Sequence, residues 1–130
     1  MPYSNSGIKR KMSELSDWIS DVVVRMPKDN YMQTLMQIIV NNDVGADAAY
    51  YIAFHAGSTG DCLEALAALR VHLIQIRSAI AKVYASSRRK DAVHVINEAQ
   101  YAAFSQIMKL LEHQVNNFTA KKAEENASVK

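Results

Sequence analysis

The stretch Leu66–Val83, with the sequence LAALRVHLIQIRSAIAKV, decides the fold class of this chain. Its large apolar residues recur every seven positions in two series, which are Leu66, Leu73 and Ile80, and Leu69, Ile76 and Val83. Alternating steps of three and four residues place both series on one face of an α-helix. No proline or glycine interrupts the stretch. The pattern therefore predicts a long helix that buries one continuous seam.

The segment before this helix predicts two more. A first stripe steps by 4, 3, 4, 3 and 4 residues and stops before Pro27; it contains Ile8, Met12, Leu15, Ile19, Val22 and Met26. Asp29 or Asn30 then caps a second helix, with Asn41–Asp43 and Gly45 as a weak spot that permits a kink. The last turn of that helix, Tyr50–Phe54, is apolar on all sides, which predicts burial on more than one side.

Two breaks separate the remaining helices. The loop Gly57–Gly60 precedes Asp61 and Glu64, whose spacing resembles a capping box at the start of the third helix. After Ser86–Lys90, Asp91 is expected to cap a fourth helix that runs to about Phe118. We therefore predict one all-α domain, an antiparallel up-down-up-down four-helix bundle over residues 8–118, with a polar arm at 1–7 and a polar, frayed tail at 119–130.

The third and fourth helices carry more apolar surface than a single seam needs. The fourth has two stripes whose centres lie about 100° apart, and the third has apolar residues outside its seam. We assign the surplus to an interface between copies of the chain, made by Val71, Ile74, Tyr101, Phe104, Met108 and Leu111. The alternative is a thick single bundle in which these two helices are central.

Catalytic and metal-binding patterns do not emerge from the sequence. Gly57–Gly60 is followed by Asp61, which would repel a phosphate. The four histidines lie far apart in sequence, so we expect no metal site, no cofactor and no enzymatic activity. Cys62 continues the helical seam backward from Leu69, which favours core packing over reactivity. We see neither an apolar secretory segment nor a run long enough to span a membrane, so we expect a cytoplasmic protein.

Charge is segregated along the chain despite a formal net charge of only +2. Residues 29–69 contain five acids and no base, whereas residues 65–90 contain six bases and no acid, which are Arg70, Arg77, Lys82, Arg88, Arg89 and Lys90. Arg70 and Arg77 are seven residues apart and flank the seam. They either form salt bridges with Asp43 and Asp47 or a neighbouring subunit, or they present a surface to a polyanion or an acidic partner. The helix dipole alone accounts for the cluster at 88–90.

A resemblance sharpens this expectation. The turn Arg25-Met26-Pro27-Lys28, followed by Tyr31–Leu35, and the Leu-Arg-rich segment Leu69–Arg77 resemble the four-helix-bundle proteins encoded in ribosomal-RNA intervening sequences and the accessory variability proteins of diversity-generating retroelements. The resemblance covers about residues 16–118. It implies a non-enzymatic homo-oligomer, pentameric in that family, whose basic surface binds a reverse transcriptase and RNA or DNA. The matching cations are Arg25, Lys28, Arg70 and Arg77. This chain departs from the family late in the fourth helix, where Leu110–His113 replaces a Gly-Gly-Trp-like stretch.

The sequence thus predicts a self-associating accessory or adaptor protein that binds a nucleic-acid enzyme, nucleic acid, or both through the basic edge of the third helix. Two alternatives remain. One is a small inhibitor or adaptor, such as a phage-encoded one, that contacts protein only. The other is a helical small subunit of a ribonucleoprotein complex.

Overall fold

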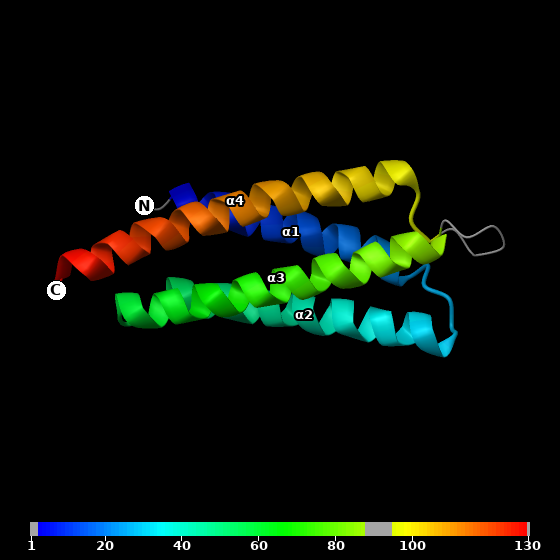
Figure 1. The fold of residues 1–130 in the computed structure, drawn as a ribbon, viewed down its shortest axis with the longest axis horizontal. Coiled ribbons are helices and arrows are strands. Elements are labelled where there is room, and N and C mark those ends of the chain that lie inside the picture. The colour runs from blue at the N-terminus through cyan, green and yellow to red at the C-terminus, as the bar shows by residue number, and fades with distance from the viewer. Residues whose placement is uncertain (1–2, 88–94, 130) are drawn as a thin grey trace.

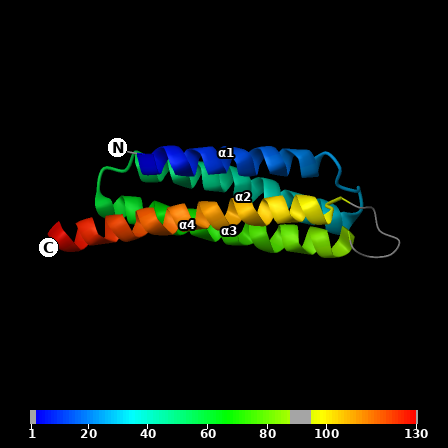
Figure 2. The same ribbon diagram turned by 90° about the horizontal axis from the view of Figure 1, so that it is seen from above.

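The chain folds into four long helices arranged as a bundle. A computed structural model describes residues 3–87 and 95–129, and the side chains of residues 7–87 and 95–127. The helices are α1 (Tyr3–Val23), α2 (Asn30–Phe54), α3 (Thr59–Ser87) and α4 (Glu98–Val129) (Figure 1). Successive helices run antiparallel and all four lie nearly along one axis (Figure 2). The predicted all-α four-helix bundle is confirmed.

Each helix packs against its two neighbours around the bundle: α2 against α1 and α3, and α4 against α3 and α1. The seam of α3 forms the centre of the core, since all six of its residues are at most 1% exposed. The stripe of α1 predicted from Ile8 to Met26 is buried as well. Within residues 3–87 and 95–129, none of the helices combines the length and apolarity needed to cross a bilayer.

The helix ends differ from the predictions in several places. Asp29 does cap α2, because its Oδ1 accepts a hydrogen bond of 2.9 Å from the Met32 amide. Helix α3, however, begins at Thr59, and the cap is Ser58 rather than Asp61, because the Ser58 hydroxyl accepts from the Asp61 amide at 3.1 Å. Asp61 therefore lies inside the first turn.

Helix α4 begins later and ends later than expected. Asn97 and Gln100 form a reciprocal capping box, with the Gln100 amide 2.8 Å from Asn97 Oδ1 and the Asn97 amide 2.9 Å from Gln100 Oε1. The expected cap, Asp91, lies outside the described residues. The predicted arm at 1–7 and tail at 119–130 are also helical for most of their length, because α1 starts at Tyr3 and α4 continues to Val129.

Helices α2 and α3 pack together far more closely than α1 packs against α2. One point of close approach is Gly45, where an added Cβ would lie only 2.5 Å from Cε1 of His72 on α3. His72 Nδ1 lies 2.8 Å from Asn42 Oδ1, and Asn42 Nδ2 donates to the Ile38 carbonyl at 2.8 Å. Gly45 thus allows a close approach rather than a kink, and α2 is continuous through it.

Candidate functional site

The predicted cation pair on α3 lies beside α4, not beside α2. Arg70, Ile74 and Arg77 line one side of a groove between α3 and α4. Facing them are Ser105, Lys109, Glu112 and Asn116, each one position after a residue of the buried stripe of α4, together with His113. The groove has two adjoining hollows of about 90 and 620 Å³, which share Arg77, Glu112 and Asn116. We call this surface the α3–α4 groove.

The groove carries an excess of positive charge. Among its described lining residues, Arg70, Arg77 and Lys109 are formally cationic and Glu112 alone is anionic. Arg77 Nη1 donates to Glu112 Oε2, and this ion pair bridges the two helices. Arg70 and Lys109 form no ion pair within the described part of the chain. The salt bridges to Asp43 and Asp47 considered from sequence are absent there, because both arginines lie on the side of α3 that faces α4.

The other predicted cations do not join the groove. Lys82 is exposed on α3, and Arg88, Arg89 and Lys90 lie outside the described residues. Arg25 and Lys28 belong to the connection between α1 and α2, and this connection lies at the same end of the bundle as the C-terminus of α3 (Figure 1). There Arg25 Nε donates to the Val95 carbonyl at 3.2 Å. The structure therefore brings together two of the predicted cations in this groove and adds Lys109 to them.

Half of the predicted oligomer interface lies in the core of the bundle. Phe104, Met108 and Leu111 are only 1, 2 and 0% exposed, so these three side chains cannot meet a second copy. Tyr101 is half-buried and its ring stacks on that of Tyr84, with centroids 4.2 Å apart. The predicted interface did not include the second apolar stripe of α4. Within that stripe, Ala103 is exposed, and Ile107 and Leu110 are half-buried.

Two predicted interface residues do remain on the surface. Val71 and Ile74 of α3 are 51 and 49% exposed. Ile74 lines the α3–α4 groove between the two arginines. Apolar area is thus available next to the cations, as the prediction requires.

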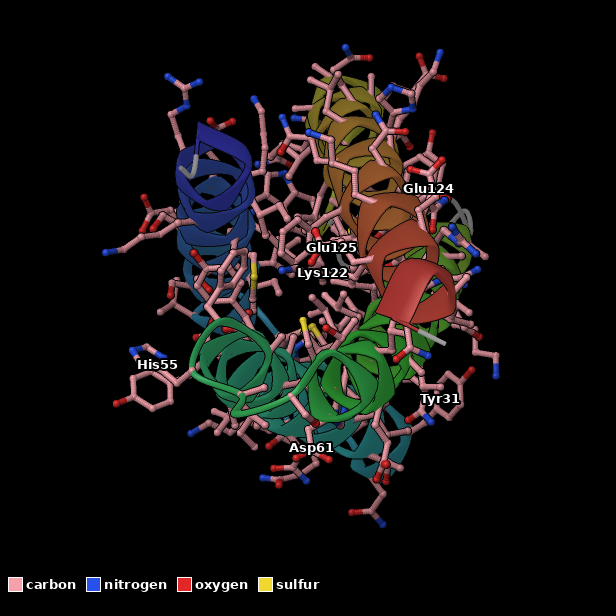
Figure 3. All side chains as sticks on the ribbon, turned by 90° about the vertical axis from the view of Figure 1, so that its left-hand side faces the viewer. Tyr31, His55, Asp61, Lys122, Glu124 and Glu125 are labelled. Atoms are coloured by element: carbon pink, nitrogen blue, oxygen red, sulfur yellow. The ribbon has the colours of Figure 1, made fainter. Side chains whose placement is uncertain are left out.

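The predicted role of Cys62 in core packing is confirmed. Its side chain is 5% exposed among core residues, and burial raises the pKa of the thiol, with the nearby Lys122 ammonium acting in the opposite direction. Lys122 and Glu125 of α4 face the inside of this end of the bundle, whereas Glu124 points outward (Figure 3). A buried thiol with a raised pKa is a poor nucleophile.

The sequence contained a signal for the α4 side of the groove. Ser105, Lys109, Glu112 and Asn116 follow one another by 4, 3 and 4 residues, each directly after a residue of the stripe Phe104, Met108, Leu111 and Val115. This places them on one flank of the helix. Periodicity alone did not show that this flank faces α3 and not α1.

The comparisons with known proteins do not indicate what the α3–α4 groove binds. Comparisons of the chain with protein-family models, with curated proteins and with solved structures find no match. In the part of the chain that the structure describes, no three His, Cys, Asp or Glu side chains converge as metal ligands would.

Proposed function

We propose that this chain is a non-catalytic adaptor that binds the phosphate backbone of RNA or DNA in the α3–α4 groove. The observation that supports it best is the meeting of Arg70, Arg77 and Lys109, from two helices, along one groove with a single carboxylate. Guanidinium groups donate paired hydrogen bonds to phosphate, and an ammonium adds a point charge. Small polar side chains beside them, Ser105 and Asn116, supply further donors for phosphate oxygens.

The ion pair between Arg77 and Glu112 is compatible with this role. Arg77 is 48% exposed and Glu112 is 27% exposed, and a pair so open to water stabilises a fold by only about 0–1 kcal/mol. Glu112 therefore positions the Arg77 guanidinium over the groove, and separating the two side chains costs little free energy. A phosphate that approaches Arg70 and Lys109 can take over Arg77 from the carboxylate.

Self-association belongs to the same proposal, because Val71 and Ile74 leave apolar area exposed beside Arg70. The resemblance noted in the sequence adds a reverse transcriptase as the protein partner, a pentamer as the assembly and the cytoplasm as the location. An adaptor that contacts protein only, or a helical subunit of a ribonucleoprotein, is the competing function.

The proposal predicts binding that weakens steeply with salt. We expect duplex DNA or RNA, labelled with a fluorophore, to raise the anisotropy signal when the protein is added at about 50 mM salt. If three or four phosphates are neutralised, the dissociation constant should rise about 40- to 150-fold between 50 and 200 mM salt. Arg70→Ala with Lys109→Ala should weaken binding and lower the slope of log affinity against log salt by about 1.8.

The matched control is Lys9→Ala with Arg10→Ala, which removes the same charge from exposed positions on α1. Helical circular dichroism should be unchanged in both variants, since none of the four residues is buried. If the two double variants weaken binding equally, the α3–α4 groove is not the site. If neither DNA nor RNA binds at the lower salt concentration, the protein-only adaptor replaces the proposal.

A further inference from the structure

A second groove lies on the opposite side of α3, along the outer face of the α2–α3 pair. Its volume is about 690 Å³. The floor consists of alanines, which are Ala48, Ala49, Ala65 and Ala68, and of Gly45, on which the ring of His72 packs. Ile52 and Tyr51 stand beside the floor, at the C-terminal end of α2. We call this surface the α2–α3 groove.

The large apolar side chains at this groove are uncovered. From sequence, Tyr50–Phe54 was expected to be buried on more than one side, yet Tyr51 and Ile52 are 64 and 56% exposed. About two turns earlier on the same helix, and outside the lining of the groove, Val44 is 63% exposed. Large apolar side chains exposed beside an alanine-lined groove are typical of an interaction site.

The charge at the groove limits the kind of partner. Its formally charged lining residues, Asp61 and Glu64, are both acidic, and neither forms an ion pair within the described residues. Figure 3 shows Asp61 on the outer side of the α2–α3 pair, away from the interior that Lys122 and Glu125 face. No Lys or Arg occurs between residues 29 and 69. A complementary occupant must therefore bring Lys or Arg beside its apolar residues.

The shape favours an α-helix as the occupant. Small side chains on the floor let a third helix approach α2 and α3 closely, at the short end of the usual interaxial range of about 8–10 Å. Apolar residues at i, i+3, i+4 and i+7 of such a helix would lie on the alanines and against Ile52. We propose that the α2–α3 groove binds a basic amphipathic helix of a partner protein, a role separate from phosphate binding in the α3–α4 groove.

Two designed peptides test the charge requirement. One is roughly 18 residues, about five turns, with Leu and Ala on one face and Lys and Arg along its flanks. The other has the same apolar face with Glu in place of the cations. We expect the intact protein to bind the basic peptide, followed by fluorescence anisotropy, and to bind the acidic peptide at least about tenfold more weakly.

Two neighbouring alanines provide a matched pair for the location. Ala68 lines the α2–α3 groove, whereas Ala67 is exposed on α3 outside it. Ala68→Gln fills the groove with a neutral side chain that helices tolerate, and it should weaken the basic peptide by about tenfold or more. Ala67→Gln should leave the affinity unchanged. Asp61→Asn with Glu64→Gln should weaken the basic peptide and reduce its salt dependence.

Three results would overturn the inference: no binding of the basic peptide in the high micromolar range, equal binding of both peptides, or equal effects of the two glutamine variants. Analytical ultracentrifugation tests whether the groove is instead occupied by a second copy of the chain. If Ala68→Gln but not Ala67→Gln dissociates an oligomer, the occupant is a second copy of this chain and the inference is wrong. Arg70→Ala with Lys109→Ala should not alter peptide binding, so failure of the phosphate-binding proposal would be seen separately.

Discussion

At the scale of single residues, Ser87 joins the end of α3 to the start of α4. Its side chain is 1% exposed. The hydroxyl donates to the Val83 carbonyl at 3.0 Å and accepts from the amides of Val95 and Ile96 at 3.2 and 3.3 Å. One oxygen thus satisfies two buried amides that precede α4, and the chain on both sides of residues 88–94 is fixed relative to α3.

Replacing Ser87 with alanine should therefore destabilise the bundle out of proportion to the single atom removed. Two buried amides would lose their acceptor, and an unsatisfied buried polar group costs about 1–3 kcal/mol. We expect urea denaturation of Ser87→Ala to show a loss in that range. Ser78→Ala, at an exposed position of the same helix, is the control and should change stability by less than about 0.5 kcal/mol. Equal stability of the two variants would show that water can replace the hydroxyl.

At the scale of helices, the contact between α2 and α3 depends on the absence of a side chain at Gly45. Glycine within a helix normally costs about 0.5–1 kcal/mol relative to alanine. Here an added Cβ would lie 2.5 Å from Cε1 and 2.8 Å from Nδ1 of His72. His72 cannot move aside without stretching its contact with Asn42, so the steric cost outweighs the gain in helix propensity.

We expect Gly45→Ala to destabilise the protein by about 1–3 kcal/mol, as overpacking of a tight contact does. Combining it with His72→Ala, which removes the ring, should restore part of that loss. The interaction term from the double-mutant cycle, measured by urea denaturation, should be at least about 1 kcal/mol. Additive effects of the two substitutions would mean that Gly45 is required for some reason other than the ring.

The buried faces of α1 and α3 could be predicted from the sequence, whereas that of α4 could not. The seam of α3 and the stripe of α1 were predictable because their large apolar residues recur in regular steps of three and four. Helix α4 has two stripes of similar apolar content, so the sequence did not show which of them faces the other helices. The burial of Phe104, Met108 and Leu111 was missed for this reason. The partner of Arg77 could not be predicted. Periodicity places Arg77 on one flank of α3, but the handedness of the bundle decides whether α2 or α4 lies beside that flank. The start of α3 was missed because Ser58 and Asp61 are both good capping residues.

At the scale of the whole molecule, the two grooves on either side of α3 carry net charges of opposite sign. Arg70, Arg77 and Lys109 line the α3–α4 groove, and Asp61 and Glu64 line the α2–α3 groove. Two further acids of α2, Asp43 and Asp47, lie toward α1, where Asp43 Oδ1 accepts from the Ser16 hydroxyl at 2.9 Å. The two proposals together assign a polyanion to the α3–α4 groove and a basic helix to the α2–α3 groove.

The acids at the α1–α2 contact should also set the pH dependence of folding. Burial raises the pKa of Asp43 above its ordinary value of 3.8, against the Ser16 hydrogen bond, and burial together with the Asp43 charge raises the pKa of Asp47. A carboxyl with a raised pKa in the folded state holds its proton to higher pH than in the unfolded state. The contribution of these two acids to stability therefore falls as pH rises from 3.8 through the raised pKa values, and the loss is complete above them.

Asp43→Asn with Asp47→Asn should remove this loss, because asparagine keeps an acceptor for Ser16 and carries no charge. We expect the double variant to be more stable than the parent protein at pH 7, with the advantage shrinking as pH falls toward 3.8. Urea denaturation at a series of pH values measures it. Asp21→Asn, which removes an exposed carboxylate of α1, controls for the change in net charge. An advantage that stays constant across this range would mean that the gain comes from packing and not from the titration of these two acids.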